Sequence, residues 1–98
     1  MSQRLSFNAL AQQELREAAA FYSKESPALA HAFLDEVEYA LTQIREFPRS
    51  CPLLSRTVRK KVLRRFPYNV LYSVRSDAIR ILAVAHQKRR PFYWRSRR

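Results

Sequence analysis

Glycine is missing altogether from this chain of 98 residues. Glycine-rich loops hold the phosphates of dinucleotides and nucleoside triphosphates, because only glycine lets the backbone approach the phosphate groups so closely. The sequence therefore excludes both kinds of phosphate loop. We expect no nucleotide cofactor.

Cysteine is almost missing, since Cys51 is the only one and it lies between Pro48 and Pro52. It has no partner for an internal disulfide, which fits a reducing compartment, and we expect its thiol to be inert. The two histidines, His31 and His86, are too distant in sequence from each other and from Cys51 to give the ligand spacing of a metal site. We expect no metal.

Long apolar runs are missing as well. The longest aliphatic run, residues 81–85, is far shorter than a membrane-spanning helix requires. The first residues lack the apolar stretch of a signal peptide. These observations predict a cytoplasmic protein that does not enter a membrane.

Acidic residues are nearly absent from the second half of the chain. The last 50 residues carry fifteen Lys and Arg but only one acid, Asp77, whereas the first 48 carry four Lys and Arg against seven Asp and Glu. The basic half has two interpretations: a surface that binds phosphates, or a surface covered by an acidic protein partner. Because 47% of the residues are hydrophobic, we expect one folded domain over residues 1–98 rather than disorder.

The first half predicts a short strand followed by a helical hairpin. Leu5 and Phe7 alternate with polar neighbours, which is typical of a strand over residues 4–7. Asn8 is a suitable N-cap for a helix that continues to about residue 24, because apolar residues then recur on one helical stripe. Ser26 and Pro27 begin a second helix that Pro48 stops. A turn of two residues, 25 and 26, predicts that the helices are antiparallel.

The second half changes to a period of two, which predicts strands over residues 57–66, 69–75 and 78–86 after a loop at 49–56. Turns at 67–69 and 76–77 are short enough for an antiparallel meander. The order is β-α-α-β-β-β, an α+β domain in which a helical hairpin covers one face of a small, mainly antiparallel sheet. A basic tail with an aromatic cluster follows, and we expect residues 95–98 to fray.

This order of helices and strands, with the residues at its boundaries, resembles the RelE/ParE superfamily of type II toxin–antitoxin toxins, and the ParE branch in particular, over roughly residues 3–95. The resemblance implies a toxin that is paired with an antitoxin and blocks growth in its free form. From the residues we expect no cofactor. Members similar to ParE poison DNA gyrase, and members similar to RelE cut mRNA on the ribosome. The residues that carry the resemblance are Glu14, Leu15, Ala18, Phe21, Tyr22, Phe33, Val37, Ala40, Leu41, Ile44, Phe47, Pro48, residues 65–68, Val70, Tyr72, residues 81–86, Arg90, Pro91, Tyr93 and Trp94.

A nuclease of this fold needs a group that activates the 2′-hydroxyl, cations for the phosphorane and a proton donor for the leaving oxygen. The candidates are Arg59, Arg65, Arg80 and His86, and the last two share a face if their strand is regular. No carboxylate lies between Glu46 and Asp77, and Tyr93 between two aromatic residues is typical of packing. His86 also fits a structural hydrogen-bonding role or a partner contact.

The basic and aromatic residues of the second half are candidates for binding an antitoxin or a target. A guanidinium near aromatic rings suits bidentate capture of a carboxylate or a phosphate, although an arginine on a strand can also serve solubility alone. The aromatic cluster of the tail either stacks on nucleic-acid bases or folds back over the sheet or the helical hairpin. The candidates are Arg64, Arg65, Tyr68, Arg80, His86, Arg89, Arg90, Tyr93 and Trp94.

Three functions are consistent with these patterns. The first is a non-enzymatic toxin that inhibits DNA gyrase and forms a hetero-oligomer with an antitoxin whose acidic, initially disordered segment covers the basic surface. The second is a ribosome-dependent mRNA endonuclease that uses the arginines and His86. The third is a non-toxic relative that binds only its antitoxin or a nucleic acid. The shortage of carboxylates near the cations favours the first.

Overall fold

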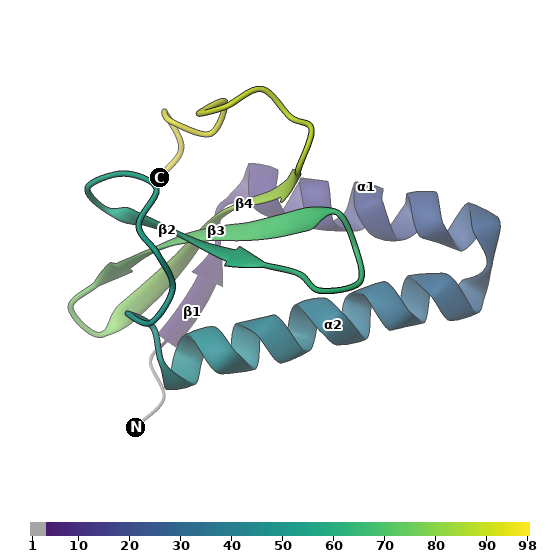
Figure 1. Cartoon of the computed structure of the whole chain (residues 1–98), viewed down its shortest axis with the longest axis horizontal. Coiled ribbons are helices and arrows are strands. Elements are labelled where there is room, and N and C mark those ends of the chain that lie inside the picture. Colours follow the sequence, from purple (N-terminus) through teal and green to yellow (C-terminus); the bar gives the residue numbers. More distant parts are fainter. Residues whose placement is uncertain (1–3) are drawn as a thin grey trace.

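The computed structural model describes residues 4–98. Its elements follow the expected order: β1 (Arg4–Phe7), α1 (Ala9–Glu25), α2 (Pro27–Glu46), β2 (Val58–Val62), β3 (Tyr68–Arg75) and β4 (Ala78–His86). The helices form a hairpin against the sheet, and the segment after β4 turns back above it (Figure 1). Within residues 4–98, no helix has the length and apolar character needed to span a membrane.

The sheet is mixed, with the strand order β1-β4-β3-β2. β1 pairs in parallel with β4, Arg4 opposite Ala78, and the two other pairings are antiparallel. The hairpin of helices carries the chain from β1 at one edge to β2 at the other. The predicted α+β architecture, with a mainly antiparallel sheet, is confirmed.

The predicted caps set the ends of both helices. The side-chain oxygen of Asn8 accepts a hydrogen bond from Leu10 N at 2.8 Å, and Ser26 Oγ accepts one from Leu29 N at 3.0 Å. Ser26 also ends α1, because its N–H donates to Tyr22 O. The helices are therefore joined by one residue, which is shorter than the expected two-residue turn.

The strand expected over residues 57–66 is wrong in its second half, because β2 ends at Val62. The backbone N–H groups of Arg64 and Arg65 donate to the carboxylate of Glu36 on α2 instead of a neighbouring strand. The chain then returns through Phe66, which is 6% exposed and packs in the core. A helix carboxylate thus replaces strand pairing at this turn.

The main core lies between the helices and the inner face of the sheet. Small residues on α1 allow close helix packing, while α2 and the strands contribute large apolar side chains that are almost completely removed from water. Its most buried members are Ala11, Phe33, Ile44, Val70, Tyr72, Ile79 and Ile81.

A bulge in β4 changes which face its residues occupy. Leu71 pairs with Ala83 and Tyr72 pairs with Ile81, so Leu82 has no opposite residue. Before the bulge Ile79 and Ile81 face the helices, and after it Val84 does. The expectation that Arg80 and His86 share a face is therefore wrong, since it assumed a regular strand.

The outer face of the sheet carries a second, smaller core under the tail. Trp94 is 6% exposed and packs there with Val58, Leu71 and Leu82. This confirms that aromatic residues of the tail fold back over the sheet. The expected fraying of residues 95–98 is wrong, because Asn8 Nδ2 donates to Arg98 O at 2.8 Å and Arg97 is held by an ion pair.

Candidate functional site

Glu14 on α1 is the centre of a polar cluster that joins α1, β4 and the tail. Its Oε1 accepts from Arg97 Nη1 at 2.8 Å and from the backbone N of Val84 at 3.0 Å. Its Oε2 accepts from Tyr93 Oη at 2.7 Å and from Arg97 Nη2 at 3.1 Å. The carboxylate is thus held by a bidentate guanidinium and two further donors.

The ion pair is nearly buried and completes the sheet where a strand is absent. The side chains of Glu14 and Arg97 are 11% and 10% exposed. β1 pairs with β4 only as far as Ile81, and beyond it Leu82 O accepts from Arg97 Nη1 at 3.1 Å. Together with the Val84 contact, these side chains satisfy backbone groups of β4 that have no strand beside them.

Tyr93 is held on both its ring and its hydroxyl. The guanidinium carbon of Arg89 lies 3.9 Å from the ring centroid, and that of Arg97 lies 4.9 Å away. Burial, followed by the hydrogen bond to Glu14, raises the pKa of the Tyr93 phenol. These contacts support the packing role that the sequence indicated for Tyr93.

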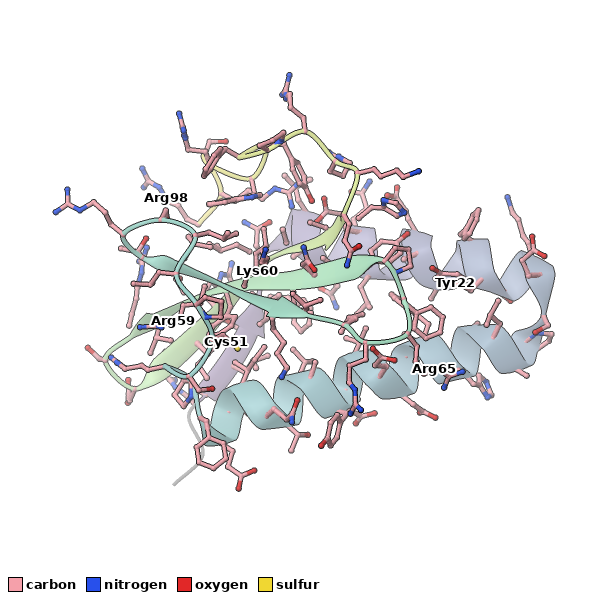
Figure 2. All side chains as sticks on the ribbon, viewed as in Figure 1. Tyr22, Cys51, Arg59, Lys60, Arg65 and Arg98 are labelled. Atoms are coloured by element: carbon pink, nitrogen blue, oxygen red, sulfur yellow. The ribbon has the colours of Figure 1, made fainter. Side chains whose placement is uncertain are left out.

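Arg65 presents a free guanidinium from a fixed backbone. Its N–H donates to Glu36 Oε2 at 3.0 Å, which holds the turn between β2 and β3 against α2. The side chain is exposed, with its guanidinium carbon 5.7 Å from the Phe66 ring centroid. Figure 2 shows Arg65 at this turn. Arg64 is exposed on the same turn, so both remain accessible to a partner.

Arg59 fixes the loop before β2. Its Nη1 donates to the carbonyl oxygens of Cys51 at 2.7 Å and Arg49 at 3.0 Å, and Figure 2 shows Arg59 close to Cys51. Tyr72 Oη donates to Pro48 O at 2.8 Å, and burial raises the pKa of this phenol, with Cys51 adding to the effect. The guanidinium of Arg59 is therefore engaged by backbone carbonyls.

Arg80 and His86 lie in different surroundings. Arg80 donates to Ser6 Oγ at 3.0 Å and to Arg98 O at 3.3 Å on the outer face of the sheet. His86 Nδ1 accepts from Lys88 N at 3.1 Å, and its ring packs edge-on against Tyr68 at a centroid distance of 5.0 Å. The structural hydrogen-bonding role considered for His86 fits these contacts.

The four nuclease candidates are therefore not brought together. Arg59 serves a loop, Arg65 projects from a turn, and Arg80 and His86 occupy opposite faces. The tail candidates divide as well: Arg89 and Arg90 are exposed, Tyr93 is half-buried and Trp94 is buried. Tyr68 is half-buried among Tyr22 and Phe33 and contributes to the core.

Sequence reasoning missed the role of two helix carboxylates. Glu14 pairs with Arg97 and Arg89 of the tail, whereas Glu36 accepts from the backbone N–H groups of Arg64 and Arg65. One signal was available for Glu14. It follows Ala11 by three residues and precedes Ala18 by four, which places an acid on the buried stripe of α1, where acids are rare unless paired.

Comparison with known proteins identifies the family. A family model described as the ParE toxin of a type II toxin–antitoxin system, parDE, matches residues 5–91. The chain belongs to the ParE toxin family. A solved structure described as the chromosomal ParDE toxin–antitoxin system from P. aeruginosa is similar, with a TM-score of 0.75 and 18% identity over 87% of this chain and 96% of that chain. A search of curated proteins finds no match.

Membership of the ParE family confirms the resemblance seen in the sequence and makes the chain a type II toxin. The match to the family ends at residue 91, whereas Tyr93 and Arg97, which hold Glu14, follow it. The polar cluster around Glu14 therefore joins a residue within the ParE match to the tail that follows the match.

Proposed function

We propose that this ParE-family toxin acts by binding and inhibiting DNA gyrase, and that a cognate antitoxin neutralises it. The observation that carries the proposal is the separation of Arg80 from His86 on opposite faces of the sheet. General acid–base catalysis requires its groups within hydrogen-bonding reach of one substrate position. Scattered cations instead suit a surface that binds another macromolecule.

The antitoxin is expected to contribute acidic side chains. Within residues 4–98, Arg89 and Arg97 are the only cations in ion pairs, and both pair with Glu14. The remaining cations of the basic half therefore repel one another until an acidic segment covers them. An initially disordered segment suits this task, because it can follow an extended surface as it folds.

Two assays of the purified chain separate the proposal from its alternative. Inhibition of DNA supercoiling by purified gyrase, at toxin concentrations that leave ribosome-bound mRNA uncut, is the expected result. Cleavage of mRNA in the ribosomal A site without an effect on gyrase would replace the proposal with the nuclease function.

A genetic experiment tests the pairing with an antitoxin. We expect expression of the chain alone to stop growth, and co-expression of the adjacent open reading frame to restore it. The two products should then co-purify as a hetero-oligomer that dissociates at high salt, since the interface is expected to be electrostatic. Harmless expression of the chain alone would contradict the toxin function.

A further inference from the structure

A cavity of about 330 Å³ opens on the outer face of the sheet, away from the helices. Its walls come from the loop before β2 with the first residue of β2, the end of β3, Leu82 of β4 and the tail. A cavity of this size can hold a small ligand. Its lining includes Ser55, Arg56, Ser73, Arg75, Trp94 and Arg95.

Positive charge is concentrated at this cavity without compensation. Arg56, Arg75 and Arg95 line it and are exposed, and none of them has an ion-pair partner within residues 4–98. Arg97 also lines it but is neutralised by Glu14. None of the lining residues is an aspartate or a glutamate. Three exposed arginines thus line one space, and their charges repel one another until an anion enters.

Hydroxyl donors accompany the three arginines. Ser73 lies at the cavity wall and is 4% exposed. Ser55 Oγ accepts from Val58 N at 3.3 Å, so its own proton is free to be donated. Two hydroxyl groups therefore lie beside the arginines as possible donors to a ligand.

The tail holds one side of the cavity in a strained conformation. Phe92 has φ of 60°, in the left-handed region that costs a bulky residue free energy. Its ring centroid lies 5.6 Å from that of Trp94 and 5.3 Å from the guanidinium carbon of Arg95. The aromatic pair therefore fixes the wall that carries Arg95.

We propose that this cavity binds a phosphate-bearing ligand, with Arg56, Arg75 and Arg95 on the phosphate oxygens and Ser73 donating to one of them. Three unpaired guanidinium groups match the charge of a diphosphate or a terminal phosphate, whereas a single carboxylate leaves two of them uncompensated. Arginine side chains supply the donors, so the absence of glycine-rich loops is no obstacle. The site goes beyond gyrase inhibition and does not depend on it.

The single tryptophan of the chain provides the measurement, because Trp94 lines the cavity. We expect pyrophosphate to change the fluorescence of Trp94 in the full-length chain with a saturable isotherm at constant ionic strength. The phosphorylated end of a nucleic acid offers the same phosphate chemistry. Two oligonucleotides that differ only in a 5′-phosphate test this second source. Tighter binding of pyrophosphate indicates a free oligophosphate, and a clear preference for the 5′-phosphorylated strand indicates a nucleic-acid end.

Matched variants separate this site from the general attraction of a basic protein for anions. The cavity pair R56Q and R75Q, made together, should weaken pyrophosphate binding at least about tenfold, because each charge-assisted hydrogen bond contributes strongly. The control pair R16Q and R45Q removes the same charge from exposed positions on the helices and should change binding less than about twofold. Equal losses in the two pairs would overturn the proposal.

Ser73→Ala tests the hydroxyl without altering charge. It should weaken pyrophosphate binding several-fold while the unfolding midpoint stays within a few degrees of wild type. Unchanged affinity of both the Ser73 and the arginine variants overturns the proposal. A second result would also overturn it: a tetraglutamate peptide that binds as tightly as pyrophosphate and binds more weakly to the R56Q and R75Q double variant. The site would then recognise an acidic peptide.

Discussion

Glu14 and Arg97 are 83 residues apart in the chain, yet Oε1 and Oε2 of the carboxylate lie 2.8 and 3.1 Å from the two terminal nitrogens of the guanidinium. Because the same carboxylate accepts from Val84 N, one side chain ties the tail and β4 to α1. The tail therefore belongs to the folded domain, and its contacts can be tested by their effect on stability.

Replacing Glu14 with glutamine should lower the free energy of unfolding by about 3 kcal/mol, because it leaves the nearly buried Arg97 without its counter-charge. Urea unfolding followed by circular dichroism measures this change. Glu25→Gln is the control, since Glu25 is exposed and its replacement should stay within about 0.5 kcal/mol. Equal stability of the two variants would contradict a stabilising ion pair between Glu14 and Arg97.

Deleting residues 95–98 should destabilise the chain by roughly 3 kcal/mol, because it removes Arg97 from Glu14 and Arg98 O from Asn8 Nδ2. Combining the deletion with Glu14→Gln should cost much less than the sum of the two changes, since both disrupt the same ion pair. Equilibrium unfolding of the four proteins provides this cycle. A deletion with wild-type stability would mean that the tail frays after all.

Local signals in the sequence were sufficient for most of the fold. The caps at Asn8 and Ser26, and the alternating side chains of β3, depend only on residues that are close in the sequence. All were predicted correctly. The bulge at Leu82 could not be predicted, because the alternation of apolar and polar residues is hidden where a strand is buried on both faces. That one residue reversed the predicted relation between Arg80 and His86.

The polar cluster required information that spacing along the chain does not contain. Glu14 meets Val84 across 70 residues and Tyr93 across 79. The stripe of α1 could identify Glu14 as an acid in need of a partner, but not which cation would supply it among nineteen Lys and Arg residues. The cavity beside Ser73 has the same origin, since segments that are distant in the chain form its walls.

Stability should fall at alkaline pH, in part through Tyr93. Burial and the hydrogen bond to Glu14 raise the pKa of the folded phenol above its ordinary value of 10.0. The stabilisation by the neutral Tyr93 phenol is therefore complete below pH 10. As pH rises above 10, the phenol of the unfolded chain ionises first, and the free energy of unfolding falls by about 1.4 kcal/mol per pH unit. Unfolding of wild type and Tyr93→Phe between pH 8 and 11 should show a shallower decline in the variant; parallel curves would contradict this cause.

His86→Ala should leave inhibition of DNA supercoiling unchanged within about twofold, because His86 packs on Tyr68 and caps the backbone of Lys88 rather than facing Arg80. A loss of one hydrogen bond and one ring contact predicts a stability change of about 1–2 kcal/mol. Gyrase assays at a temperature where the variant stays folded separate the two effects. Abolished toxicity in a fully folded variant would favour the nuclease.

Arg65→Ala should weaken binding of the cognate antitoxin about tenfold or more, because its exposed guanidinium is free to pair with an acidic side chain while its backbone is already ordered. Stability should change by less than about 0.5 kcal/mol, since Glu36 binds the backbone N–H of residue 65 and not its side chain. Calorimetric titration of the antitoxin measures the affinity. Arg16→Ala removes another exposed charge, from α1, and should have little effect. Similar losses in both variants would show that only net charge is recognised, and Arg65 would no longer be a specific contact.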